Sequence, residues 1–174
     1  PEPPPPSFDA NFWAVQLRVD SAGAQDTSNF AGVHPNAMDT LDIYDVHDPG
    51  TLANPFVIGY FDETTWGADS GRYAHVINQT PFAAGNQQRY PLTIEQNTGA
   101  DVTLSFPNFA DLPTTDWAYQ LQDMDTLQTW PIVSGFTQTY TPAGATKRYD
   151  VIATRLNDFT SRLDCSLGPQ NPAP

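Results

Sequence analysis

The spacing of apolar residues constrains the fold more than any other feature of this chain. Trp13, Val15, Leu17 and Val19 alternate with small or polar residues, which is the pattern of a half-buried strand. Comparable short runs cover residues 56–61, 73–77, 90–96, 102–106, 117–122, 129–133, 136–141 and 148–154. No stretch keeps a helical spacing of apolar residues over several turns. The sequence therefore predicts an all-β protein.

Turn-forming residues separate these runs, among them Asn97-Thr98-Gly99, Asp111-Leu112-Pro113 and Pro142-Ala143-Gly144. Many short strands between such turns favour two packed antiparallel sheets. We therefore expect an antiparallel β-sandwich of the immunoglobulin-like or jelly-roll-like type.

The predicted strands place one domain over residues 9–156, and its second half, residues 90–154, is dense enough in strands to be immunoglobulin-like. Residues Asp20 to Asn54 contain the closely spaced aspartates, and we expect them to form a long Asp-rich loop. Two small sheets stacked end to end are the alternative arrangement.

Proline-rich extended segments flank this domain, as an N-terminal tail over residues 1–8 and a C-terminal tail over residues 157–174. Proline fixes an extended backbone that gives a sheet no amide hydrogens. Such a segment loses little entropy on binding. We therefore expect the first tail to dock on other copies of the protein through Pro3, Pro4, Pro5, Pro6 and Phe8.

The charge of the chain is strongly negative: 20 acidic residues against 7 basic ones give a net charge of −13. Such a chain repels nucleic acid and anionic membrane surfaces. No apolar run approaches the roughly 18 residues of a membrane span. The neutral polar composition favours an extracellular or cell-surface location. Cys165 is the single cysteine and has no partner within the chain, so we expect a free thiol.

Four aspartates stand three residues apart, namely Asp39, Asp42, Asp45 and Asp48. They are the densest group of potential ligands in the chain. Calcium takes six to eight oxygen ligands, and Asp26 precedes the group in sequence. One interpretation is a calcium site; the other is that the carboxylates accept backbone amides in turns. The EF-hand pattern is not present. The predicted calcium ligands are Asp26, Asp39, Asp42, Asp45 and Asp48.

The remaining candidate sites are weaker. His47, with Asp45 and His75, has no zinc-site spacing, and Ser70 has no recognisable catalytic triad around it, so we expect no enzyme. Trp66 lies in a turn-like stretch and is the best candidate for stacking on a sugar ring. Asn78 begins an Asn-Gln-Thr glycosylation sequon.

Several short patterns recur in a particular order. The first half contains Trp13-x-Val15-x-Leu17 and then Asp39-x-x-Asp42-x-x-Asp45, and the second contains Val102-x-Leu104-x-Phe106 and Tyr149-x-Val151. This order resembles β-sandwich modules of large secreted bacterial surface proteins, and the second half is similar to the immunoglobulin-like part of flagellar hook-capping proteins. The resemblance implies an extracellular, non-catalytic module and carries over no catalytic residue.

Two functions follow from these features. The first is a non-catalytic structural subunit or module of a surface assembly, such as a filament or cell-envelope array, that self-associates head to tail through its tails. The alternative is a carbohydrate-binding accessory module of a secreted hydrolase. Exposed aromatic side chains in a row favour the second, and tails packed on another copy favour the first.

Overall fold

A computed structural model describes residues 8–51, 53–81 and 83–157 of the protein. The predicted docking residues Pro3 to Pro6, the C-terminal tail after residue 157 and Cys165 lie outside the described residues. None of the helices in the described ranges has the length and apolar character needed to cross a membrane.

Strands dominate the described residues, which confirms the all-β prediction. Two short 3₁₀ turns, Gly67–Asp69 and Phe109–Asp111, complete the regular structure. The strands are β1 (Trp13–Ser21), β2 (Ala24–His34), β3 (Val46–His47), β4 (Val57–Glu63), β5 (Gly71–Gln79), β6 (Gln87–Gln96), β7 (Val102–Ser105), β8 (Trp117–Asp123), β9 (Thr129–Pro131), β10 (Thr137–Tyr140) and β11 (Thr146–Arg155).

The strands form one 11-stranded sheet in the order β10-β7-β1-β2-β5-β4-β6-β11-β8-β9, with β3 paired to β5 at the side. Strand β2 runs parallel to β5, so the sheet is mixed and the purely antiparallel prediction was wrong. A parallel pair needs a long crossover, and residues 35–70 provide it. Their turns and short strands give no local sign that they carry the chain across the sheet.

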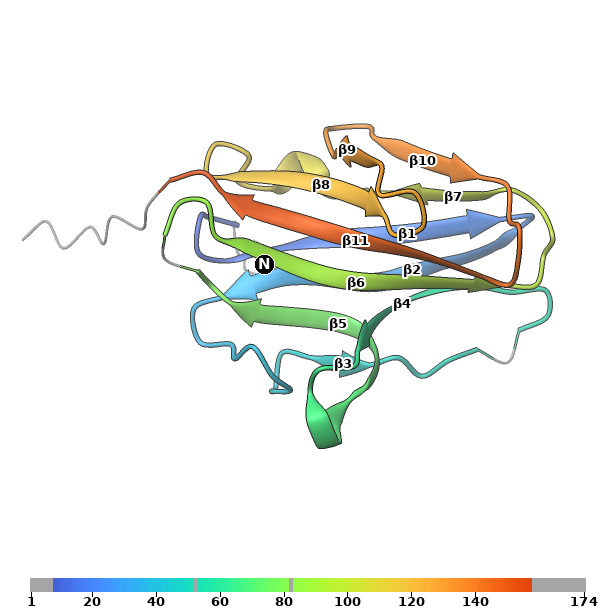
Figure 1. The fold of residues 1–174 in the computed structure, drawn as a ribbon, viewed down its shortest axis with the longest axis horizontal. Coiled ribbons are helices and arrows are strands. Elements are labelled where there is room, and N and C mark those ends of the chain that lie inside the picture. Colours follow the sequence, from blue (N-terminus) through green and yellow to red (C-terminus); the bar gives the residue numbers. More distant parts are fainter. Residues whose placement is uncertain (1–7, 52, 82, 158–174) are drawn as a thin grey trace, which may run out of the picture.

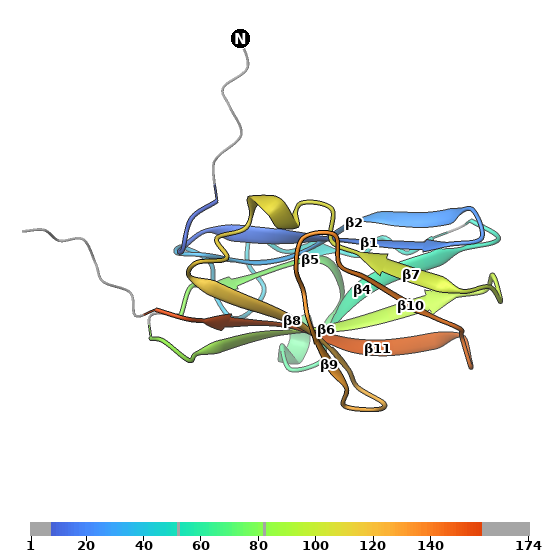
Figure 2. The same ribbon diagram turned by 90° about the horizontal axis from the view of Figure 1, so that it is seen from above.

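The sheet curls into a half-barrel around one core. Figure 2 shows β1 and β2 along one side and β6 and β11 along the other. Strands β9 and β10 end the strand order, yet they follow each other in the chain, so residues 132–136 join the two ends of the sheet. The finer prediction of an immunoglobulin-like sandwich is not confirmed.

Aromatic side chains fill the space inside the curl. The Trp13 ring from β1 meets the Trp117 and Tyr119 rings from β8 edge to face, with centroids 5.1 and 5.0 Å apart. These strands lie near opposite ends of the strand order (Figure 1), so the rings join the two sides of the half-barrel. Both tryptophans are fully buried, which confirms that the alternating pattern marks the core face.

Strand β2 lies within the stretch that we expected to be a long loop, and this prediction was wrong. Its first half is polar and lies beside an opening in the sheet, so it has no apolar alternation to reveal it. Its second half approaches β1 closely: a Cβ atom at Gly32 would lie 2.2 Å from the backbone oxygen of Trp13. Only glycine permits this contact.

Candidate functional site

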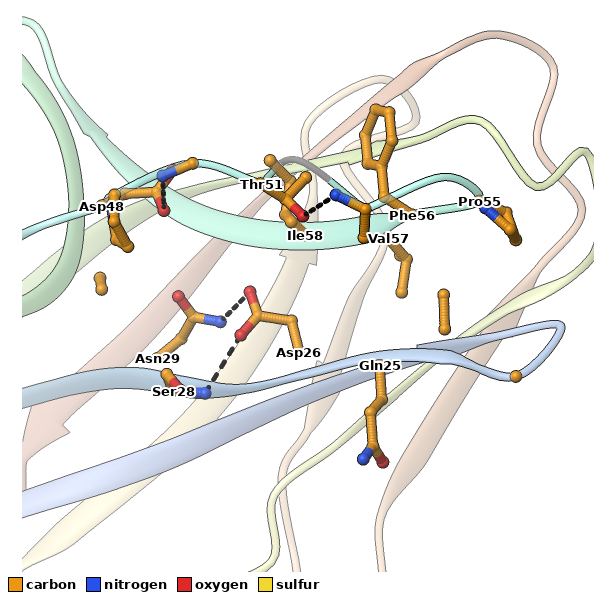
Figure 3. Close-up of a pocket in the computed structure, with 16 residues that line it drawn as sticks. Gln25, Asp26, Ser28, Asn29, Asp48, Thr51, Pro55, Phe56, Val57 and Ile58 are labelled. Carbon is orange, nitrogen blue, oxygen red and sulfur yellow. Dashed lines mark hydrogen bonds between the residues drawn. The ribbon is translucent and has the colours of Figure 1, made fainter.

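A cleft of about 410 Å³ opens between residues 48–51 and 53–56 on one side and strands β2 and β4 on the other. Figure 3 shows Asp26, Ser28 and Asn29 on one side of this cleft and Asp48 and Thr51 on the other. The fold therefore brings two of the predicted calcium ligands, Asp26 and Asp48, to the same cleft although 21 positions separate them in sequence.

The cleft exists because neighbouring strands diverge. Strand β5 pairs with β2 only from Phe30 onward, and with β4 only from Phe61 to Glu63. In the described sheet, the earlier halves of β2 and β4 are therefore not joined by backbone hydrogen bonds. A side chain has to satisfy the polar backbone groups that this divergence leaves inside the protein.

The Asp26 carboxylate bridges the two diverging strands. Its Oδ2 accepts hydrogen bonds from the backbone N–H of Gly59 at 2.9 Å and from Asn29 Nδ2 at 2.8 Å. Its Oδ1 accepts the backbone N–H of Ser28 at 3.1 Å. Asn29 is fully buried, so loss of this carboxylate would leave an unsatisfied buried amide. Asp26 thus links β2 to β4 where these two strands do not pair with each other.

At the other side of the cleft, Asp48 anchors the segment that covers the cleft, which begins at Asp48 itself, to β5. Its Oδ1 accepts the Gly50 N–H at 2.9 Å, and its Oδ2 lies 3.1 Å from Arg72 Nη2. The Arg72 guanidinium also pairs with Glu95 and lies 3.6 Å above the Tyr60 ring. Burial, followed by the Glu95 carboxylate, raises the pKa of Tyr60 to about 12. The cleft therefore has one wall fixed by a network of charges.

The other three aspartates lie along β5 and in the turn before β3. Asp39 Oδ1 accepts the Gln79 N–H at 3.0 Å, and Asp45 Oδ1 accepts the Ile77 N–H at 2.9 Å. Asp42 accepts the N–H groups of Met38 at 2.6 Å and Tyr44 at 2.7 Å. These carboxylates hold residues 38–45 in shape and fasten the segment to the sheet.

The predicted calcium ligands are thus divided between the cleft and the β5 edge. Within residues 8–51, 53–81 and 83–157, no three His, Cys, Asp or Glu side chains are grouped to share a metal ion. Each of the five carboxylates accepts at least one backbone N–H instead. Calcium binding stays a prediction, and backbone capping is the role that these contacts support.

Glu63 is a buried acid that the sequence does not distinguish. It ends β4 and is only 7% exposed. Burial, followed by the charges of Asp45 and Asp62, raises its pKa to about 7. Burial also raises the pKa of Asp45. No local pattern identifies this pair, because the two residues come from separate segments that the fold brings near each other.

The histidines pack against aromatic rings. His34 lies between Phe12 and Tyr44, with centroids 5.2 and 4.4 Å away. His47 stacks on Tyr73 at 4.4 Å, and His75 meets Phe30 edge to face at 5.0 Å. Burial lowers the pKa of His75. Each ring therefore has a packing role.

Trp66, Asn78 and Ser70 also make structural contacts. The Trp66 ring packs edge to face on Tyr73 at 4.8 Å, and the residue is half-buried. Asn78 is 8% exposed, and its Nδ2 donates to Gln88 Oε1 at 3.2 Å, so attachment of a glycan would break that bond. Ser70 Oγ donates to the Thr64 carbonyl at 3.1 Å.

The segment before β3 has an apolar surface that the sequence did not predict. A shallow hollow of about 580 Å³ lies there and is mostly apolar; we call it the apolar hollow, and its lining is Asn36, Met38, Leu41, Asp42, Ile43, Tyr44 and His47. Ile43 is 90% exposed and Met38 52%. Each is adjacent to an aspartate in the sequence, Met38 to Asp39 and Ile43 to Asp42. An apolar residue within an acidic, polar segment was the signal that could have indicated this surface.

Comparison of the chain with protein-family models, with curated proteins and with solved structures gave no match.

Proposed function

We propose that this protein is a non-catalytic structural module of an extracellular or cell-surface assembly, and that its copies associate through their proline-rich tails. One observation carries the proposal: a β-structure of net charge −13 exposes an apolar hollow. Contiguous exposed apolar surface marks interaction sites in soluble proteins. The secreted, immunoglobulin-like character expected from the sequence fits such a module.

The non-catalytic part of the proposal rests on how the polar side chains are used. Asp26, Asp39 and Asp45 accept backbone amides at points where strands lack a partner. Asp48 and Arg72 hold the segment over the cleft. Groups committed to the backbone in this way support the fold, and they are not free to bind a substrate or to transfer a proton.

Sedimentation velocity of the full chain over a range of concentrations tests the proposal. We expect association that grows with concentration, and its loss when Pro1 to Ser7 is deleted. The matched control is Val133→Ser, which removes an exposed apolar side chain from the loop between β9 and β10 and should leave association unchanged. A chain that stays monomeric at every concentration would contradict the proposal.

The cleft favours carbohydrate binding as a second function. A sugar is recognised through hydrogen bonds to polar side chains, and Ser28 and Thr51 place hydroxyl groups on the walls of the cleft. Figure 3 shows the Phe56 ring and the Gln25 amide directed away from Asp26, so this cleft offers hydrogen bonds rather than a stacking platform. Calorimetric titration with neutral oligosaccharides, compared between the wild type and Thr51→Val, would measure this activity.

A further inference from the structure

The apolar hollow is shaped before any partner arrives. The Asp42 carboxylate accepts the N–H groups of Met38 and Tyr44, which lie on opposite sides of it in sequence. Asp45 Oδ2 in turn accepts the Asp42 N–H at 2.9 Å. A binding surface held in this way loses little conformational entropy when it is filled.

A row of aromatic rings connects the hollow to the first described residues. Phe8 packs on Phe12 with centroids 5.5 Å apart, Phe12 packs on His34 at 5.2 Å, and His34 packs on Tyr44 at 4.4 Å. Tyr44 lines the hollow. The segment that precedes Phe8 therefore starts at the same end of the molecule as the hollow.

We propose that the apolar hollow of one copy binds the Pro3 to Pro6 run of a second copy, an inference that rests on the proposed function. Proline-rich segments in the polyproline II conformation dock on apolar, aromatic-lined surfaces. The hollow supplies Tyr44, Met38 and Ile43 for such contacts. The four prolines carry no charge, so they place no like charge beside the Asp42 carboxylate that lines the hollow.

The reach of the segment favours a second copy over the same chain. A polyproline II helix advances about 3.1 Å per residue. A segment that follows the aromatic row back from Phe8 has to pass Phe12 and His34 before it meets Tyr44. On such a path the prolines nearest Phe8 would cover the row of rings, and the run of four prolines could not lie across the hollow as a whole. A second copy can lay all four prolines across it.

This arrangement makes the exchange reciprocal. Because Phe8, where the segment leaves the described residues, and the hollow lie at one end of each copy, two copies facing each other can each donate and each receive. Such an interface uses the same surface patch on both partners and closes as a two-fold dimer. It differs from the head-to-tail arrangement expected from the sequence, and each dimer contains two equivalent contacts.

Mixing of two full-length variants tests the exchange. Ile43→Asp removes the receptor at a side chain that is 90% exposed, so folding should be unaffected. Pro4→Ser with Pro5→Ser removes the donor. Each variant alone should associate at least tenfold more weakly than the wild type in sedimentation experiments. A mixture should form a heterodimer, because the intact segment of one variant meets the intact hollow of the other.

The failures are distinguishable. Association that is lost in the proline variant but unchanged in Ile43→Asp would overturn the hollow as receptor and leave the proposed function standing. A wild type that stays monomeric, with a segment that proteases cut faster in Ile43→Asp, would show docking within one chain and overturn both the exchange and the proposed function. The control Val133→Ser should behave like the wild type in each experiment.

Discussion

At the scale of single residues, the Glu63 carboxyl group couples stability to pH. Its pKa is raised from 4.5 to about 7 in the folded protein, so the folded state holds a proton that the unfolded chain has lost in this range. Stability from this group is fully present below about pH 4.5 and decreases as the pH rises toward 7. Neutral side chains of the same shape should avoid this loss.

We predict that Glu63→Gln raises the free energy of unfolding at pH 8 by up to about 3 kcal/mol, since one pKa unit corresponds to about 1.4 kcal/mol. At pH 4 the variant and the wild type should differ little. Urea unfolding at both pH values measures the difference. Asp111→Asn, at an exposed acid, is the control. An equal effect of Glu63→Gln at both pH values would show that its charge does not matter.

At the scale of elements, side chains fasten the aspartate-rich residues 38–45 to β5, and we call this segment the strap. Strand β3 contributes two residues to the sheet, which is too short to hold the segment. Asp39 and Asp45 add hydrogen bonds to Gln79 and Ile77 on β5. A net hydrogen bond to a charged group contributes roughly 1.5–3 kcal/mol, so these carboxylates matter more than the short ladder.

Asp45→Ala should therefore free the strap without unfolding the core. We expect amide hydrogen exchange at Ile77 to accelerate about tenfold or more, because its N–H loses its acceptor, while amides of β1 stay protected. The measurement is made in chelator and again in calcium, with Asp111→Ala as the control. Equal protection of the wild-type Ile77 amide in both solutions supports capping by carboxylates. Protection of this amide that depends on calcium would establish the predicted metal site.

At the scale of the whole molecule, the two halves of the sequence are interleaved. Strand β7 from the second half pairs with β1 from the first, through Val19 opposite Leu104. Strand β6 likewise pairs with β4 along residues 57–61. Trp13 and Trp117 meet inside the core that both halves enclose. Neither half therefore has a complete sheet or a complete core of its own.

We predict one cooperative unfolding transition, with coincident curves from tryptophan fluorescence and far-ultraviolet circular dichroism. A fragment of residues 90–157 should remain unfolded, because β7 and β6 lose their partners from the first half. Its NMR spectrum should lack the dispersion of a folded β-protein. A dispersed spectrum would instead support an autonomous immunoglobulin-like unit.

The sequence by itself determined the strand class, most strand positions and the core face. Alternation along a strand is local, so Trp13 and Trp117 could be assigned to the core without knowledge of their neighbours. The aspartates were also found from the sequence alone. Their roles could not be assigned from the sequence, because a carboxylate that accepts a backbone N–H and one that binds calcium have the same local sequence pattern.

The tertiary structure alone decided which strands are neighbours and what each carboxylate contacts. The parallel pairing of β2 with β5 and the bond from Ile77 to Asp45 join residues more than 30 positions apart. Such contacts depend on register across the sheet, which local spacing does not encode. The polar half of β2 escaped prediction because most of its side chains are exposed. It is placed by its pairing with β1 and by the hydrogen bond from Gly59 to Asp26, and neither contact leaves an apolar alternation in the sequence.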